Sequence, residues 1–157
     1  MPTKKHFLLS LLVVLILLPC FVKAGELGDA LKNKEGNTVF LEAIDLYLAE
    51  QYDDAIVKYN EALKVSPDDA FVHNFLAHAL RKAGKVDEAI EEYKAALKIN
   101  PKYAYAHNNL GEALLEKELF DEAIAEFTLA IKCDGRHELA ARNIKKAKAI
   151  QAEKNKK

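Results

Sequence analysis

The sequence predicts an all-α protein, an α-α superhelical solenoid of three helix-turn-helix repeats followed by a C-terminal capping helix. The chain aligns with itself at a constant shift that brings Ala55 onto Ala89 and Ala89 onto Ala123, which is typical of repeat architectures. Apolar residues within each repeat recur at the spacing of a helix face. Half of the 157 residues are apolar and 30% are charged, with only six Gly and four Pro. This composition excludes a disordered chain and a disulfide-rich scaffold.

The period of this shift places the repeats at residues 36–69, 70–103 and 104–137. Many positions keep their residue type in all three repeats. Examples are Ala55, Ala89 and Ala123, then Tyr59, Tyr93 and Phe127, and then Ala62, Ala96 and Ala130. So many matches in one register indicate repeated structural units rather than a compositional bias.

Each repeat is predicted to form two helices. In the second repeat, the first helix has the i, i+3, i+4, i+7 stripe His73, Leu76, Ala77 and Leu80. Each second helix starts with two acidic residues and ends with a lysine, an order that the helix dipole favours. Pro101 ends the second helix of that repeat, because proline has no N–H and disfavours helical geometry in its predecessor.

The pattern resembles the tetratricopeptide repeat. The second repeat carries the signature most fully, with Leu76, Ala77, Leu80, Gly84, Ala89, Tyr93, Ala96 and Pro101. The first repeat departs from it at Glu42, which replaces the expected leucine. Glu50 and Glu118 replace the turn glycine, so less regular turns are expected there. The resemblance implies a concave groove, lined by the first helices, that binds an extended peptide or a helix of another protein.

The first 24 residues are predicted to be a signal peptide. Lys4 and Lys5 precede the uncharged run Phe7–Leu18, and a peptidase site follows at Ala24. Crossing a bilayer takes about 20 apolar residues, and this run is shorter. We therefore expect an exported protein, in a bacterial periplasm, with an uncleaved membrane anchor as the alternative. Residues 25–35 are expected to be a flexible lead-in.

Charge is distributed unevenly along the chain. Residues 25–140 carry 13 Lys and Arg against 23 Asp and Glu, which argues against binding nucleic acid. Residues 138–157 are predicted to be a capping helix and basic tail, with seven basic residues after position 140. A solubilising cap is the simpler interpretation. The alternative is peripheral contact with anionic lipid or an acidic partner.

No catalytic or metal-binding pattern is present, so we expect neither an enzyme nor a cofactor. The sequence has no phosphate-binding loop, no serine elbow and no Cys-x-x-Cys motif. His73 and His107 occupy equivalent packing positions, roughly 10 Å apart, which is too far for one zinc ion. Once Cys20 leaves with the signal peptide, Cys133 is alone. It is either inert or pairs two chains into a homo-oligomer.

The candidate partner-binding residues lie on the opposite face of the first helices, grouped by a rotation of about 100° per residue. Aromatic side chains there offer contact area, and Asn side chains can bond to a peptide backbone. The alternative is that the rings pack between repeats and the Asn residues face water. The residues are Phe40, Ile44, Tyr47, Phe71, Asn74, Phe75, His78, Arg81, Tyr105, Asn108, Asn109 and Glu112.

These observations predict an exported, non-enzymatic adaptor. Its groove would hold a peptide or helix of a protein partner and aid assembly of an envelope complex. Co-chaperone repeats that clamp a C-terminal carboxylate carry Lys, Arg and Asn at positions that are Phe40, Ile44, Tyr105 and Asn109 here, so that clamp is not expected. Two alternatives stay open: a self-associating scaffold and a membrane-tethered accessory subunit.

Overall fold

A computed structural model describes residues 34–135 and 137–156 of the chain. Seven helices and no strands occur in these residues, which confirms the predicted all-α class of helical repeats with a final helix. The predicted signal peptide, and the lead-in up to residue 33, lie outside the described residues. The helices are α3 (Lys34–Leu48), α4 (Tyr52–Val65), α5 (Ala70–Lys82), α6 (Val86–Ile99), α7 (Ala104–Glu116), α8 (Phe120–Cys133) and α9 (Glu138–Lys154).

The helices follow the period of the sequence. The second repeat contains α5 and α6, and the third contains α7 and α8. In the first repeat, α3 begins at Lys34, so the helix starts inside the segment expected to be a flexible lead-in. The chain separates into two compact units. Unit 1 ends at Pro67, and unit 2 runs from Asp68 to Lys157.

In unit 1, α3 packs against α4 through small and aromatic side chains. Ala43 and Ala55 are fully buried, which lets the two helices approach closely. The Phe40 ring lies 5.9 Å from the ring of Tyr59, measured between centroids. Phe40 therefore belongs to the core of this helix pair.

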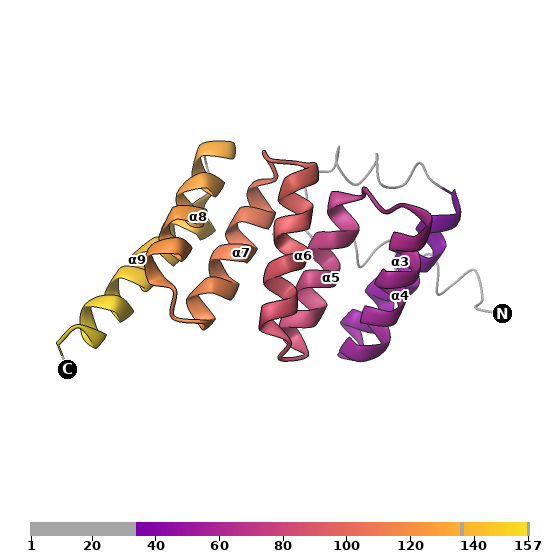
Figure 1. Cartoon of the computed structure of the whole chain (residues 1–157), viewed down its shortest axis with the longest axis horizontal. Coiled ribbons are helices and arrows are strands. Elements are labelled where there is room, and N and C mark those ends of the chain that lie inside the picture. The colour runs from indigo at the N-terminus through magenta and orange to yellow at the C-terminus, as the bar shows by residue number, and fades with distance from the viewer. Residues whose placement is uncertain (1–33, 136, 157) are drawn as a thin grey trace. The chain divides into compact units, whose positions relative to one another are not determined.

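In unit 2, each helix from α5 to α9 packs against the next along the chain (Figure 1). The large side chains at the repeated aromatic position, Tyr93 and Phe127, are fully buried. Phe127 lies directly over Gly111, where an added Cβ would come within 2.6 Å of the ring. The small residue in the first helix and the ring in the second are therefore matched in size.

A histidine–glutamate pair joins the two helices of each repeat in unit 2. His73 Nδ1 lies 2.6 Å from Glu92 Oε2, and His107 Nδ1 lies 2.7 Å from Glu126 Oε2. Burial alone would lower the pKa of His107. Its hydrogen bonds to Glu126 and to the Pro101 carbonyl oxygen outweigh burial and raise the pKa above its ordinary value. These histidines thus help to hold each repeat together.

The three turns inside the repeats share one backbone geometry, although sequence reasoning expected two of them to be less regular. Glu50, Gly84 and Glu118 have positive φ angles of 60°, 80° and 62°. Each donates its N–H to the residue three positions earlier, and the next N–H reaches five positions back. This is the Schellman ending of a helix, which usually uses glycine because a side chain disfavours positive φ.

Substituting Glu50→Gly should stabilise the protein by a few tenths to about 1 kcal/mol. The substitution removes the steric cost of a left-handed residue, which is about 1–2 kcal/mol, and glycine's greater freedom in the unfolded chain offsets part of the gain. Urea denaturation measures the difference. Gly84→Ala is the reverse test and should destabilise the protein, because alanine is strained at the positive φ of residue 84. Nothing lies within 4 Å of the added Cβ, so a steric clash would not explain the loss. A destabilised Glu50→Gly variant would contradict the strain argument.

Candidate functional site

Amide side chains link the first helices of unit 2 to one another. Asn109 Nδ2 on α7 donates to Asn74 Oδ1 on α5 at 3.1 Å. One repeat later, Asn143 Nδ2 on α9 donates to Asn108 Oδ1 on α7, also at 3.1 Å. Both pairs are 35 residues apart in the chain. Because the same contact recurs, α5, α7 and α9 are held in one common register.

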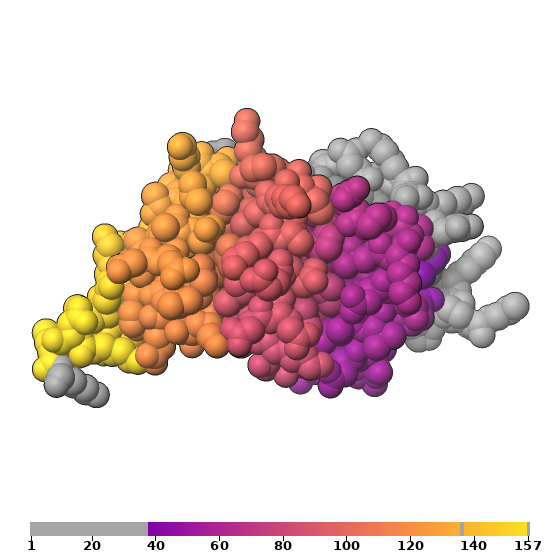
Figure 2. All heavy atoms as spheres, viewed as in Figure 1, coloured from indigo at the N-terminus to yellow at the C-terminus, as the bar shows by residue number. Residues whose placement is uncertain are grey.

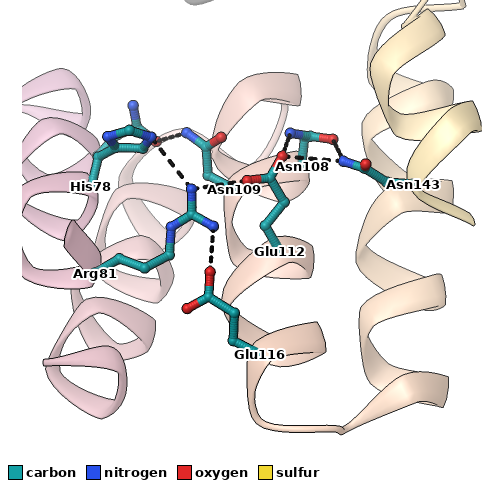
Figure 3. A network of polar contacts seen from close by, with 8 residues as sticks. His78, Arg81, Asn108, Asn109, Glu112, Glu116 and Asn143 are labelled. Atoms are coloured by element: carbon teal, nitrogen blue, oxygen red, sulfur yellow. Dashed lines mark hydrogen bonds and ion pairs between the residues drawn. The ribbon is translucent and has the colours of Figure 1, made fainter. Parts of the chain in front are cut away.

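An ion cluster lies beside this amide ladder (Figure 3). The Arg81 guanidinium contacts Glu112 and Glu116 on α7, each at 2.9 Å. The other carboxylate oxygen of Glu112 accepts hydrogen bonds from Asn108 and Asn143, each at 3.2 Å. The Arg81 side chain is only 12% exposed, so the cluster is partly desolvated and its geometry is fixed before any ligand arrives. We call the surface formed by Asn74, His78, Arg81, Asn108, Asn109, Glu112 and Asn143 the first-helix face.

His78 lies next to this cluster and is held in its neutral form. Burial is the main cause, and the nearby charges of Arg81 and Lys82 add to it, so that the pKa of His78 falls to about 3. Its Nε2 lies 3.5 Å from an Arg81 nitrogen. At neutral pH His78 therefore adds no positive charge to this part of the protein.

Aromatic rings form a row at the other end of the same helices. Phe71 and Tyr103 have centroids 5.1 Å apart, Tyr103 and Tyr105 are 6.5 Å apart, and Tyr105 and His137 are 5.3 Å apart. Tyr103 is buried, whereas Phe71 and Tyr105 are half-buried. Phe71 and Tyr105 therefore keep ring surface available at the edge of unit 2.

The structure places the predicted site residues in several different settings. In unit 2, Asn74, His78, Arg81, Asn108, Asn109 and Glu112 come together in the first-helix face, and Phe71 and Tyr105 lie in the ring row. Phe75 is buried, at 8% exposure. In unit 1, Phe40 and Ile44 are buried, and Tyr47 is half-buried with its ring 5.5 Å from that of Tyr52.

The Asn residues differ most from expectation. Sequence reasoning expected them to offer donors and acceptors to a peptide backbone, but three of the four amides in the ladder are at most 5% exposed and bond within the protein. A short polar side chain facing an equivalent one across a repeat interface satisfies itself. Their observed role is to position the first helices.

Sequence reasoning missed four residues of this region: Glu116, Tyr103, Asn143 and His137. The missed signal for Asn143 was the period itself, because Asn143 follows Asn109 by one full repeat. By that register, α9 takes the place of the first helix of a fourth repeat. The other three contribute through contacts that no spacing in the sequence reveals.

His137 caps α9, and this gives the helix a pH dependence. Its Nδ1 accepts a hydrogen bond from the Ala140 N–H at 3.3 Å, and its Nε2 is buried with no hydrogen-bond partner in the described part of the chain. Burial lowers the pKa of His137 below its ordinary value of 6.5, outweighing the charge of Asp134. Folding therefore favours the neutral ring. That contribution to stability is complete above pH 6.5 and is lost as the pH falls below it.

We expect α9 to open more often as the pH falls below 6.5, because protonated Nδ1 no longer accepts the Ala140 hydrogen bond. Amide hydrogen exchange of α9, corrected for the intrinsic pH effect, measures this opening. His137→Asn keeps a capping acceptor that does not titrate, so its α9 should show a flatter pH profile. Identical profiles in the two proteins would rule out His137 as the cause.

The described residues hold neither a candidate metal site nor a candidate membrane-spanning helix. Residues 34–135 and 137–156 contain no group of three or more His, Cys, Asp or Glu side chains arranged to hold a metal ion. In the same ranges, no helix has the length and apolar character needed to cross a membrane.

Models of one known repeat family match this sequence. Models of the tetratricopeptide repeat match residues 46–95 and 104–137, and a model described as TPR repeat matches residues 77–118. No curated protein matches the chain in sequence.

Solved structures similar to this chain are helical repeat domains. The Sgt2 TPR domain from Aspergillus fumigatus has a TM-score of 0.76 and 23% identity, covering 80% of this chain and 84% of that one. The TPR2B domain of yeast Sti1, solved in a pHsp70 complex, has a TM-score of 0.71 and 21% identity, covering 73% and 96%. SycD, a type III secretion translocator chaperone of Yersinia enterocolitica, has a TM-score of 0.68 and 22% identity, covering 76% and 85%.

Proposed function

Because this chain belongs to the tetratricopeptide repeat family, we propose that it is a protein-binding adaptor whose first-helix face and ring row bind a segment of another protein. The observation that carries the proposal is the amide ladder, which holds α5, α7 and α9 in register without a ligand. A face that is ordered beforehand loses less conformational entropy when a partner binds. We propose binding, and not catalysis, as its activity.

The ring row supplies the apolar part of this binding surface. Phe71 and Tyr105 are half-buried and flank the buried ring of Tyr103. Aromatic residues fixed in this way are enriched at the energetic centres of interfaces. Burying the remaining surface of one ring contributes up to about 1.5–3 kcal/mol to binding.

The similar structures support the same kind of partner. The yeast Sti1 domain is described in a complex with pHsp70, and SycD is described as a translocator chaperone. We propose a peptide or helix of a protein as the ligand here as well. Arg81, the basic residue among the predicted site residues, is already engaged by Glu112 and Glu116, so recognition of a lone terminal carboxylate is not the mode that this face favours.

Affinity capture with this protein as bait tests the first-helix face and the ring row. The double variant Phe71→Ala/Tyr105→Ala should lose the partner that the wild type captures, because it removes both half-buried rings. The matched control is Ile99→Ala/Leu129→Ala, which removes two exposed side chains from the second helices. Equal capture by both folded variants would contradict binding at this face.

We also propose that the protein acts outside the cytoplasm, in assembling an envelope complex. The support is the signal-like pattern of residues 1–24, with Lys4 and Lys5, the apolar run and Ala24. Mass spectrometry of the protein from its native source tests this. Cleavage after residue 24 leaves 133 of the 157 residues, whereas an intact mass would indicate a membrane tether instead.

A further inference from the structure

The last helix, α9, has the place of a first helix, and no second helix packs on it within the described residues. Asn143 makes the same contact to α7 that Asn109 makes to α5, at the same distance and chain separation. Within unit 2, α5 is covered by α6 and α7 is covered by α8. No described helix follows α9, which forms the end of unit 2 (Figures 1 and 2).

The uncovered strip of α9 can be compared residue by residue with the covered ones. Gly111, which faces Phe127 on the second helix of its repeat, and its buried equivalent Ala77 correspond to Lys145. Leu80 and Leu114, both buried, correspond to Lys148. Both lysines are exposed, and so are Ala141 and Ala152 on the same strip. The strip of α9 on which a second helix would pack is thus a row of small and cationic residues.

The charged residues in the middle of α9 are all of one sign, which a solubilising cap does not require. A cap needs polar residues of either sign, and helices α5 to α8 of this unit together carry both signs. Every charged residue of α9 between positions 142 and 148 is basic: Arg142, Lys145, Lys146 and Lys148. All four are exposed, and no ion pair joins them to another described residue. Charge of one sign attracts a partner of the other sign.

We propose that this strip of α9 is a second docking site, for an acidic helix of another protein. Such a helix would lie on Ala141, Lys145, Lys148 and Ala152 as α6 lies on α5 and α8 lies on α7. It would therefore continue an interface that the protein already makes twice. The covering helices in this protein are themselves acidic on their exposed turns, as Asp87, Glu88, Asp121 and Glu122 show. This site is separate from the first-helix face and does not depend on the function proposed for it.

The test supplies an acidic helix to the full chain. A flexible linker after Lys157 carries a second copy of the α6 sequence, residues 86–99, because a free helix of this length is marginal in water and tethering raises its effective concentration. The copy bears Tyr93→Ala, since Lys145 stands where Tyr93 would need a small residue. The measurement is amide hydrogen exchange of α9. The fusion should slow exchange in α9 compared with a fusion whose copy also has Asp87→Asn, Glu88→Gln, Glu91→Gln and Glu92→Gln.

Two pairs of surface variants locate the contact. Lys145→Glu/Lys148→Glu should abolish the protection, whereas Arg142→Glu/Lys146→Glu, with the same change in charge on a neighbouring strip, should largely keep it. The proposal would be overturned if the fusion without substitutions in α9 showed no protection. It would also be overturned if the two double variants lost the protection equally. Sedimentation of the unfused chain completes the test. Self-association that Lys145→Glu/Lys148→Glu abolishes would show that the occupant is a second copy, which also overturns it.

Discussion

Replacing Phe127 by alanine should lower the free energy of unfolding by about 3–5 kcal/mol, the usual cost of removing a large ring from a core. Phe127 is fully buried and covers Gly111, which has no side chain to fill the space that the ring leaves. A domain of this size has about 5–15 kcal/mol of stability in total. The variant should therefore lie close to the threshold for folding.

Urea denaturation followed by circular dichroism measures this loss. Leu129→Ala, on the same helix and 37% exposed, is the matched control and should cost far less. Gly111→Ala tests the same contact from the other side. The new methyl group would meet the Phe127 ring, and overpacking of this kind costs about 1–3 kcal/mol. A loss for Phe127→Ala no larger than that for Leu129→Ala would contradict the packing described here.

Substituting Asn109→Ala should destabilise the protein by about 1–3 kcal/mol, the cost of leaving a buried polar group without its partner. Asn74 is 1% exposed, and its Oδ1 accepts the hydrogen bond that Asn109 donates. Asn60→Ala removes an amide of the same type from an exposed position on α4 and should cost less.

A double-mutant cycle separates the pair from its surroundings. Asn74→Leu/Asn109→Leu removes both polar groups together, so it should recover much of the loss seen in either single variant. Additive losses in the double variant would contradict a direct bond between the two amides.

The repeat period of the sequence predicted most of the fold. It located both helices of the second and third repeats, because matched Ala and aromatic positions such as Ala89 and Tyr93 must face a neighbouring helix to be buried. It did not predict the geometry of the turn at Glu118. A left-handed residue other than glycine is uncommon, and only the surrounding helix contacts make it adopt that conformation.

The candidate site was predictable in position but not in chemistry. Helical rotation placed Asn74, Asn108 and Asn109 on one face, and the structure brings them into one network. Whether an amide bonds to its neighbour or remains available to a ligand depends on distances between helices of different repeats. The spacing along the chain does not contain those distances. For the same reason, the pairing of Arg81 with Glu116 could not be foreseen.

Site-specific photocross-linking in the native cell tests the central claim, that this protein holds another polypeptide against its first helices. A photoreactive phenylalanine analogue replaces Tyr105 in one variant and Leu129 in another, so that one probe lies beside the first-helix face and the other on an exposed second helix. We predict that the probe at Tyr105 links to one defined segment of a single protein and that the probe at Leu129 does not. Cross-links of equal yield to the same protein from both positions, or none from Tyr105, would contradict the account.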